Sequence, residues 1–285
     1  MSVTKRHWRA IVACLVVPVV LVAAPLTAAQ AHSSQPPKPK PTIVLVHGAW
    51  ADGSSWSRVA WRLQERGYTV LAPPNPLQGL APDSAYLADF LHTIHGPVIL
   101  AGHSYGGAVI TDAAVGDPEV KALVYVDAFI PDEGQTIGEL ANATPGSCLS
   151  GGGNPTNVFN LVPFPGAPEG DADLYLKFEA DGPYPGFDAC LANDIPAREA
   201  AVLYAAQRPV ALNALAERSG PPAWKSIRSY AVIGTEDHAI PPAEQRTMAG
   251  RAHAAITEVK ASHLSLISQP QVVSGVILKA AWAAS

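Results

Sequence analysis

Short apolar runs alternate along the chain with longer stretches in which apolar residues recur at helical spacing. Each short run ends at glycine, proline or a polar residue, which is typical of buried strands. Strands that alternate with helices in this way predict βαβ units and a parallel sheet. The expected strands cover residues 42–46, 68–72, 97–101, 123–126, 229–233 and 257–260, and the expected helices cover 56–66, 83–95, 108–115, 242–252 and 270–282.

The alternation stops between residues 131 and 209, where the chain is rich in glycine, proline and asparagine. No run in this stretch is a convincing strand, and helical spacing is present only over 171–180 and 196–206. A structureless loop of this length is implausible inside a compact domain. We therefore expect residues 131–209 to form a cap, inserted into a core made of 42–130 and 210–285.

The first 31 residues have the layout of a secretory signal peptide. They contain three basic residues and no acid, an apolar stretch over 10–24, and small residues at Ala29 and Ala31 for a cleavage site. The alternative is an uncleaved membrane anchor, but two prolines interrupt the apolar part, which is shorter than the ~20 residues that a span requires. We expect cleavage after Ala31, secretion, no stable membrane anchor after cleavage, and an extended tether over 32–41.

Export also affects the three cysteines. Cys14 would leave with the signal peptide, so the mature chain would retain Cys148 and Cys190. An even pair in an oxidising compartment favours a disulfide, and the alternative is two buried free thiols. We predict that Cys148 and Cys190 are bonded to each other.

Composition and charge exclude some classes of protein. With 48% hydrophobic and 15% charged residues, most of the chain cannot be disordered. It carries 19 basic and 24 acidic side chains, and removal of the three basic residues of the signal segment leaves 16 against 24. This acidic balance argues against nucleic acid or an anionic membrane as the main partner.

Residues 102–106 read Gly-His-Ser-Tyr-Gly and lie between an expected strand and an expected helix. The pattern G-x-S-x-G in that context is typical of a nucleophile elbow. The turn is so tight that a Cβ atom at Gly102 or Gly106 would collide with neighbouring strands. We expect Ser104 to be a nucleophile beside the N–H groups of a helix N-terminus. The alternative is an ordinary glycine-rich turn, against which the flanking strand and helix argue.

A nucleophilic serine needs a base and an acid that orients the base, in the chain order Ser, Asp or Glu, His. The expected base is His263, because it follows the final strand, whereas His238 adjoins the acid and His253 lies at a helix end. The expected acid is Asp237, which follows the strand at 229–233. All these positions lie at the carboxyl edge of the predicted sheet, where open α/β sheets bind their ligands.

Two further candidates for the acid stay open at this point. Glu236 adjoins Asp237, and Asp127 also ends a strand, from which its carboxylate could reach the histidine through a neighbouring loop. Exchange of each aspartate for asparagine would separate the two assignments.

An oxyanion in such a site needs two hydrogen-bond donors. One is expected from the backbone N–H of Tyr105, the residue after the nucleophile. The second is expected from Ala49 in the loop after the first strand, with Trp50 as the alternative donor. His47 in that loop is expected to hold its conformation by hydrogen bonds, and Trp50 is a candidate pocket residue.

These motifs resemble the α/β-hydrolase superfamily, and within it the branch of plant methylesterases, hydroxynitrile lyases and related bacterial secreted esterases. The resemblance spans about residues 42–281 and is weakest across the cap. It implies an α/β fold with about six parallel strands, helices on both faces and a cap over the pocket, and a triad of Ser104, Asp237 and His263 that needs neither metal nor organic cofactor. The matching segments are VLVHGAWADGSSW, AGHSYGG, VYVDAFIPDEG, IGTEDHAIPP and ASHLSLISQP.

Two positions depart from the hydroxynitrile lyases, which have a threonine in the first loop and a lysine after the catalytic histidine. The corresponding residues are Gly48 and Leu264. We therefore expect a serine carboxylesterase whose partner is a small, uncharged, partly apolar ester. The alternatives are a lyase of the hydroxynitrile type, an amidase and a non-hydrolytic binder of small ligands. No C-x-x-C, H-E-x-x-H or P-loop pattern occurs in the sequence, so no metal or cofactor is expected.

Overall fold

The computed structural model describes residues 13–14, 39–180 and 182–284, and one compact unit comprises Lys38–Ser285. The predicted signal peptide, apart from residues 13 and 14, and the tether as far as residue 38 lie outside the described residues. Within the described residues, no helix is both long enough and apolar enough to cross a membrane.

The core is a six-stranded sheet in which all neighbouring strands are parallel, as the sequence predicted. The strand order is β2-β1-β3-β4-β8-β9, so the chain adds β2 on one side of β1 and the later strands of this sheet on the other. Such a reversal places the ligand crevice at the carboxyl ends of the central strands. The strands are β1 (Thr42–Val46), β2 (Val70–Leu71), β3 (Val98–His103), β4 (Val120–Val126), β8 (Ser229–Gly234) and β9 (Ala255–Val259).

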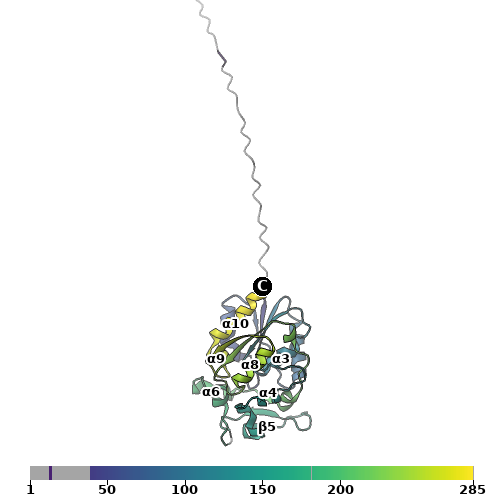
Figure 1. The fold of residues 1–285 in the computed structure, drawn as a ribbon, viewed down its shortest axis with the longest axis vertical. Coiled ribbons are helices and arrows are strands. Elements are labelled where there is room, and N and C mark those ends of the chain that lie inside the picture. Colours follow the sequence, from purple (N-terminus) through teal and green to yellow (C-terminus); the bar gives the residue numbers. More distant parts are fainter. Residues whose placement is uncertain (1–12, 15–38, 181, 285) are drawn as a thin grey trace, which may run out of the picture. The chain divides into compact units, whose positions relative to one another are not determined.

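Amphipathic helices cover this sheet (Figure 1). Helix α1 packs against α10, and α2 packs against α3, so that two helix pairs shield the central strands from water. The central strand β3 is buried over its whole length, as expected for a parallel strand covered on both faces. The helices of the core are α1 (Ser57–Gln64), α2 (Leu80–Leu91), α3 (Tyr105–Ala113), α8 (Pro242–Arg251), α9 (Ser265–Ser268) and α10 (Pro270–Ala283), with short 3₁₀ turns η1 (Gly53–Trp56) and η4 (Ala223–Lys225).

The expectation of a strandless insertion is wrong. A second sheet, antiparallel and three-stranded, joins β5 (Phe159–Val162), β6 (Asp173–Leu176) and β7 (Val210–Ala211). The helix predicted over 171–180 is therefore a strand at its centre. Along β6, Leu174 and Leu176 are buried while Asp173 and Tyr175 are partly exposed, and this alternation is typical of a strand rather than of a helix.

The remaining elements of the insertion are short helices. The helix predicted over 196–206 is confirmed as α6 (Ala197–Ala205). Figure 1 shows α4, α6 and β5 gathered at the end of the domain that lies away from the C-terminus. Strand β7 begins one residue beyond the predicted end of the insertion and belongs to the same antiparallel sheet. The helical elements that complete the insertion and its sheet are α4 (Ile137–Ala143), η2 (Cys148–Gly153), η3 (Pro155–Asn157), α5 (Phe187–Leu191) and α7 (Leu212–Ala216).

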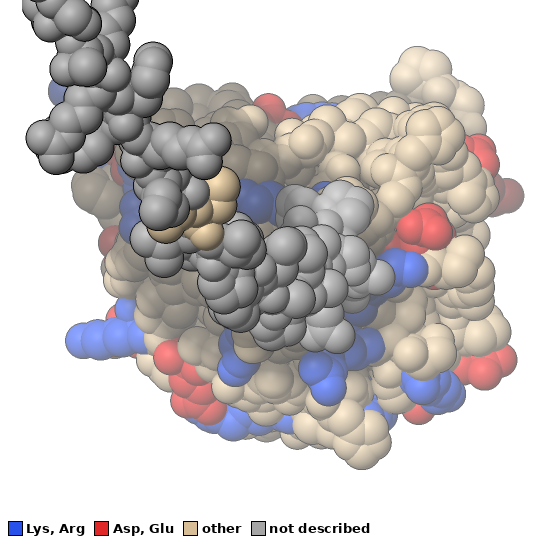
Figure 2. Space-filling view, turned by 90° about the horizontal axis from the view of Figure 1, so that it is seen from above, with Lys and Arg blue, Asp and Glu red and all other residues tan. Residues whose placement is uncertain are grey.

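Many charged side chains lie at the surface of the core. On the face seen in Figure 2, basic and acidic residues are interspersed with uncharged ones. Ion pairs such as Arg246–Glu258, at 2.7 Å, and Lys225–Asp132, at 2.9 Å, are partly exposed. Exposed pairs of this kind contribute about 0–1 kcal/mol each, so the stability of the fold rests on its apolar core.

Candidate active site

Ser104 stands at the tip of the turn between β3 and α3. Its backbone has φ of 53°, in the left-handed region that a non-glycine residue seldom adopts. The flanking glycines leave room for this turn: a Cβ on Gly106 would lie 2.6 Å from the carbonyl oxygen of Val46 in β1, and one on Gly102 would overlap the carbonyl of Gly106. The predicted collision with a neighbouring strand is confirmed for Gly106, whereas at Gly102 the collision is with the first turn of α3. The strained turn presents the serine above the sheet edge.

Ser104, His263 and Asp237 form one chain of hydrogen bonds. The Ser104 Oγ lies 2.9 Å from His263 Nε2, and His263 Nδ1 lies 2.8 Å from Asp237 Oδ2. All three side chains are buried. Because a carboxylate only accepts hydrogen bonds, the proton of the neutral imidazole belongs on Nδ1, and Nε2 is left to accept the serine hydroxyl.

The carboxylate of Asp237 is fixed by its own loop. Its Oδ1 accepts hydrogen bonds from the backbone N–H groups of Ala239, at 2.8 Å, and Ile240, at 3.0 Å. Its Oδ2 accepts a further bond, of 2.7 Å, from the side-chain amide of Gln245 in α8. Sequence reasoning missed Gln245, because an amide eight residues after the acid carries no recognisable spacing signal.

Asp127, the alternative acid, does not bond to the imidazole. Its Oδ1 accepts a 2.7 Å hydrogen bond from the N–H of Gly234, and its Oδ2 accepts hydrogen bonds from both the hydroxyl and the N–H of Ser265. The geometry therefore assigns the contact with His263 to Asp237. Asp127 instead joins the end of β4 to the end of β8 and to the segment that follows His263.

Glu236, His238 and His253 also lie outside the hydrogen-bonded chain. Glu236 pairs with Lys260 at 3.4 Å on the surface. His238 is exposed, and its Nδ1 lies 2.9 Å from the carbonyl oxygen of Ala189. His253 is exposed after α8. Of the candidate residues, the structure therefore brings only Asp237 and His263 into the hydrogen-bonded chain with Ser104.

The buried carboxylates set the electrostatics of the site. Burial lowers the pKa of His263, but the charge and hydrogen bond of Asp237 outweigh it, so the net pKa is raised above 6.5. Burial, with the nearby charge of Asp237, raises the pKa of Asp127 to about 8. Of the two carboxylates near this imidazole, Asp127 thus has the raised pKa, and Asp237 accepts the hydrogen bond of His263 Nδ1–H.

Two backbone N–H groups adjoin the serine without an acceptor of their own. Ala49 and Tyr105 are both buried, and they line the same cavity as Ser104. Within the described part of the chain, neither N–H donates a hydrogen bond. Buried donors without acceptors are rare in folded proteins, and here they match the two donors that the sequence predicted for an oxyanion.

Two buried histidines form hydrogen bonds with the loops around these donors. The Nε2 of His47 accepts the N–H of Asn75 at 2.9 Å, so its Nδ1 donates to the carbonyl oxygen of Gly48, also at 2.9 Å. This confirms the structural role expected for His47. The Nε2 of His103 lies 2.9 Å from the carbonyl oxygen of His263. Burial lowers the pKa of His103 well below its usual range, so the ring is neutral.

Trp50 links the first loop to the cap. Its indole Nε1 donates a 2.9 Å hydrogen bond to the carbonyl oxygen of Leu174 in β6, and its ring stacks on Phe159 of β5, with 5.5 Å between centroids. The side chain is buried, and its backbone φ of 56° is left-handed. The structure therefore places this predicted pocket residue at the contact between the core and the cap sheet.

Two apolar cavities flank the hydrogen-bonded chain, and Ala49 and Trp50 line both. The space open to the centre of a water molecule is about 40 Å³ in the first and about 70 Å³ in the second. We name them the His263-side cavity and the Ser104-side cavity. The former is lined by His103, His263, Leu264, Ile267, Leu191 and Leu203, and the latter by Ser104, Tyr105, Phe129, Ala141, Phe159 and Leu215.

A wider space of about 590 Å³ shares part of its lining with the Ser104-side cavity. Both are lined by Leu149 and Phe159 of the insertion and by Leu215 of α7. Glu139 and Arg218 lie in the lining of the wider space only.

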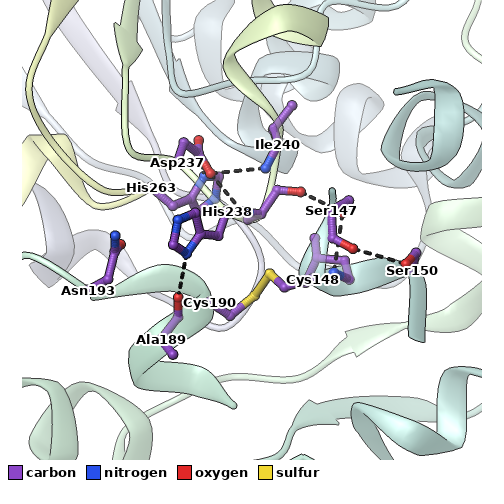
Figure 3. The surroundings of a disulfide bond; sticks show 12 residues. Ser147, Cys148, Ser150, Ala189, Cys190, Asn193, Asp237, His238, Ile240 and His263 are labelled. Atoms are coloured by element: carbon purple, nitrogen blue, oxygen red, sulfur yellow. Dashed lines mark hydrogen bonds and ion pairs between the residues drawn. A yellow bond between two sulfur atoms is a disulfide. The ribbon is translucent and has the colours of Figure 1, made fainter. Parts of the chain in front are cut away.

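The predicted disulfide between Cys148 and Cys190 is present, and it lies beside the loop that carries Asp237 (Figure 3). On one side, the N–H of Cys148 donates to the carbonyl oxygen of His238 at 2.8 Å, and Ser147 Oγ donates to the carbonyl oxygen of Ala239 at 2.7 Å. On the other side, the segment around Cys190 holds the same loop. The disulfide therefore joins two segments that both hydrogen-bond to residues 236–239, and we call this arrangement the clamp. The contacts of that second segment are Ala189 with His238 and Asn193 with Glu236.

In the described residues, no group of three or more histidine, cysteine, aspartate or glutamate side chains is arranged to hold a metal ion. The side chains of Ser104, His263 and Asp237 are hydrogen-bonded to one another. The arrangement can deprotonate a serine hydroxyl and can stabilise a negative oxygen next to it.

A parallel α/β sheet with a serine elbow, and with a histidine and an acid at the ends of later strands, defines a hydrolase-type site. Comparison with known proteins agrees: a profile of the alpha/beta hydrolase family matches residues 43–276. The chain belongs to this family, as the sequence motifs led us to expect.

Similar proteins are found by both sequence and structure. The chain is 37% identical to a carbendazim hydrolyzing esterase of Nocardioides sp. (strain SG-4G) over 108 residues, which is 33% of this chain and 45% of that enzyme. It therefore spans under half the length of this curated relative. Its fold resembles that of a pyrethroid hydrolase from Sphingobium faniae JZ-2, with a TM-score of 0.67 and 23% identity over 85% of this chain and 98% of the other.

An extracellular α/β-hydrolase from a Paenibacillus species has a similar fold as well. Its TM-score is 0.62 at 22% identity, over 84% of this chain and 98% of the other. At this level of identity the likeness concerns the fold alone.

Proposed function

We propose that this protein is an exported serine hydrolase that cleaves carboxylic esters through an acyl-enzyme. The observation that carries the proposal is the buried chain from Ser104 through His263 to Asp237, with distances of 2.9 and 2.8 Å. Family membership and the esterase activity named for its relative support the same reaction class.

In the first half of the reaction, Ser104 Oγ attacks the ester carbonyl carbon while His263 Nε2 takes the hydroxyl proton. The imidazole becomes cationic, and the carboxylate of Asp237 stabilises that charge through Nδ1–H. The carbonyl oxygen becomes an oxyanion and accepts hydrogen bonds from the N–H groups of Ala49 and Tyr105. When the tetrahedral intermediate collapses, the C–O bond to the alcohol breaks and the leaving oxygen takes the proton from Nε2.

In the second half, water replaces the alcohol. His263 Nε2 accepts a proton from the water as its oxygen bonds to the acyl carbon. Collapse of the second intermediate releases the carboxylic acid and returns the proton to Ser104. Each proton lost in one step is restored in the next, so the enzyme ends in its starting state.

The cavities support a small, uncharged and partly apolar substrate. Most of their lining consists of aliphatic and aromatic side chains, and burial of an unpaired charge among such groups is costly. Asp52 lies in the lining of the His263-side cavity, where its negative charge would repel an anionic substrate. The lowered pKa of Asp52, caused mainly by its hydrogen bond with Ser54, keeps that charge in place at neutral pH.

Labelling and turnover test the proposal together. A fluorophosphonate should attach to Ser104 in peptide mapping, and p-nitrophenyl acetate should be hydrolysed by the wild type but not by Ser104→Ala. Labelling without ester turnover, combined with cleavage of a racemic cyanohydrin, would indicate a lyase instead. Faster turnover of an amide than of the matched ester would indicate an amidase. If neither labelling nor turnover were observed, the protein would instead be a binder of small ligands with this fold.

Export is part of the proposal. It is supported by the signal-peptide pattern of the sequence and by the disulfide, because such bonds persist in oxidising compartments. Mass spectrometry of protein secreted by the native host should give a mature chain that begins at residue 32. A full-length chain retained in the cell would contradict this part of the proposal.

A further inference from the structure

One side chain outside the reacting groups, Gln245, is bonded directly to the acid of the site. It lies in α8, and only 2% of it is exposed. Its Nε2 lies 2.7 Å from Asp237 Oδ2 and 2.8 Å from the carbonyl oxygen of Ile240. Because a carboxylate and a carbonyl only accept hydrogen bonds, the group that faces them is the NH₂ of the amide, and each of its two hydrogens has a partner.

The burial of this amide is informative in itself. Burial of such a polar group costs free energy unless hydrogen bonds compensate for it. An apolar side chain would avoid that cost, as Met248 does three positions further along the same helix face, where it is fully buried. The amide of Gln245 therefore depends on its two acceptors for its place in the core.

The hydrogen bonds of the Asp237 carboxylate show what the amide adds. A carboxylate has about four lone-pair sites, two on each oxygen. The N–H groups of Ala239 and Ile240 occupy those of Oδ1, as Figure 3 shows for Ile240. The amide of Gln245 and the imidazole of His263 occupy those of Oδ2. The amide thus takes one site of Oδ2 and leaves the other for the imidazole.

The same amide also closes the segment that carries the acid. It joins the carboxylate of Asp237 to the carbonyl oxygen of Ile240, while the N–H of Ile240 holds the other carboxylate oxygen. Rotation of the carboxylate must therefore break hydrogen bonds at both oxygens. The side chain of Asp237 is fully buried, so water is not at hand to replace a donor that is lost.

We propose that Gln245 is a positioning residue, which holds Oδ2 of Asp237 in the orientation in which that oxygen accepts the hydrogen bond of His263. This inference rests on the proposed ester hydrolysis, in which the imidazole becomes cationic in both halves of the reaction. Gln245 lines neither of the two cavities beside the serine. Its effect on the reaction therefore passes through Asp237.

Three variants test the proposal. Gln245→Met has a side chain of similar length and removes both donors without adding a charge. Gln245→Glu keeps the shape but can donate only while its carboxyl is protonated. Thr144→Val is the matched control: the hydroxyl of Thr144 donates a 2.8 Å hydrogen bond to Glu244, the neighbour of Gln245 in α8, so its loss weakens the same helical turn and leaves every donor of Asp237 in place.

Steady-state kinetics with p-nitrophenyl acetate separates turnover from binding. Gln245→Met should lower kcat by about 10- to 100-fold, because a small displacement of a group that orients the base has an effect of this size. Acylation and deacylation use the same imidazole, so both should slow together and KM should stay within about twofold. Thr144→Val should keep both kcat and KM within about twofold of the wild type.

The pH dependence of kcat/KM reports on the imidazole itself. Asp237 raises the pKa of His263, so a carboxylate that has turned away should support the imidazolium less, and the acid limb of Gln245→Met should move to lower pH. The charge of the buried Asp127 also acts on this imidazole, but Asp127 is the same in every variant. A limb that moves to higher pH would mean that the amide only weakens the negative charge of the carboxylate, and would overturn the positioning role.

Gln245→Glu adds a readout that a change in stability cannot mimic. Burial and the charge of Asp237 should both raise the pKa of the introduced carboxyl. While protonated, this carboxyl can donate to Asp237 Oδ2, so at low pH its kcat should exceed that of Gln245→Met, and the advantage should disappear as the pH rises. Equal kcat in the two variants at every pH would contradict the proposal. If Gln245→Met does not fold, Gln245→Glu at low and high pH gives the same comparison within one protein.

Proton NMR gives a test that needs no substrate. The hydrogen on His263 Nδ1 lies between two buried groups and should give a resolved downfield resonance in the wild type and in Thr144→Val. In Gln245→Met the resonance should broaden or move upfield, because its acceptor is no longer fixed. An unchanged resonance in a variant that circular dichroism shows to be folded would count against the proposal.

These outcomes are distinct from failure of the proposed function. A wild type that is neither labelled by a fluorophosphonate at Ser104 nor active on esters would overturn the proposed hydrolysis, and the role of Gln245 in it. A labelled and active wild type, together with a folded Gln245→Met that keeps its kcat and pH dependence, would overturn the positioning role alone.

Discussion

The carboxyl group of Asp127 bonds to Ser265, two residues after His263, and not to the imidazole that Asp237 holds. Both aspartates follow strands of the same sheet, and both are buried. Asp237 orients the ring, whereas Asp127 fixes the backbone segment that leads away from it. Because the two carboxylates contact different groups, substitutions at Asp237 and Asp127 should have different effects on the enzyme.

Replacement of each aspartate by asparagine should affect turnover very differently. Asp237→Asn removes the acceptor for His263 Nδ1–H and favours the wrong tautomer, so kcat should fall by about 10³- to 10⁴-fold. Asp127→Asn keeps an acceptor for Gly234 and should stay within about tenfold of the wild type. Steady-state kinetics with p-nitrophenyl acetate compares them, and the opposite ranking would make Asp127 the acid.

The same pair should differ in how activity depends on pH. Because Asp237 raises the pKa of His263 above 6.5, the acid limb of kcat/KM should have its midpoint above that value. In Asp237→Asn the burial of the imidazole is no longer opposed, so the midpoint of the residual activity should move to lower pH. An acid limb that is identical in wild type and variant would show that the carboxylate does not act on His263.

Asp127 should also shape the pH dependence of stability. The folded state keeps its proton up to about pH 8, whereas the unfolded chain releases it near pH 3.8. The folded state therefore binds more protons in between, so the stability that protonated Asp127 contributes is present below about pH 4 and is lost as pH rises towards 8.

Asp127→Asn, which stays neutral, should remove this loss. The free energy of unfolding from urea titrations at several pH values between 5 and 8 should fall with pH more steeply in the wild type than in the variant. Parallel curves would mean that Asp127 is already ionised in the folded state.

Loss of the disulfide should reduce both stability and activity. The bond closes a loop with a sequence separation of 42, for which the chain-entropy treatment gives about 4 kcal/mol of stabilisation. Because the bonded segments also clamp the loop around Asp237, Cys148→Ser/Cys190→Ser should lower kcat more than it raises KM. Circular dichroism should be used to confirm that the variant is folded.

A control at Ser147 separates the clamp from global destabilisation. Ser147→Ala removes the hydrogen bond to the carbonyl oxygen of Ala239 and the 3.2 Å bond that the hydroxyl accepts from the N–H of Leu149, and it should lower kcat by a smaller factor with a loss of stability of about 1 kcal/mol for each bond. Full kcat in the folded double serine variant would show that the loop keeps its position without the clamp.

The first loop approaches the serine too closely for any side chain at Gly48. A Cβ there would lie 2.7 Å from the Cβ of Ser104 and 2.9 Å from the carbonyl oxygen of His103. Gly48→Ala should therefore displace the serine and lower kcat by at least about 100-fold. Gly275→Ala in α10, where an added Cβ meets no atom within 4 Å, is the matched control and should keep wild-type kinetics.

The sequence predicted the core well because its signals are local. The strand before Ser104 is a run of apolar residues, and the glycines around the serine are required by the turn itself. Asp237 and His263 could be placed because each directly follows a strand of a parallel sheet, whose carboxyl ends share one edge. Their actual contact distances depend on packing that no local pattern encodes.

The cap was harder to predict because its strands depend on distant partners. Leu174 and Leu176 alternate with partly exposed residues, yet β6 is short and forms only between β5 and β7, which come from far apart in the chain. Trp50 could be suggested as a pocket residue, but its bond to Leu174 spans 124 residues and leaves no trace in sequence spacing. Such long-range contacts override local propensity.

The insertion leaves the core after β4 and returns before β8, and these two strands are hydrogen-bonded neighbours in the sheet. The whole cap is therefore an excursion between adjacent positions, and its length and sequence can change without altering the register of any core strand. Natural variation or laboratory recombination can exchange it as a cassette, which would give a new substrate range while the reacting serine, histidine and aspartate stay where the sheet holds them.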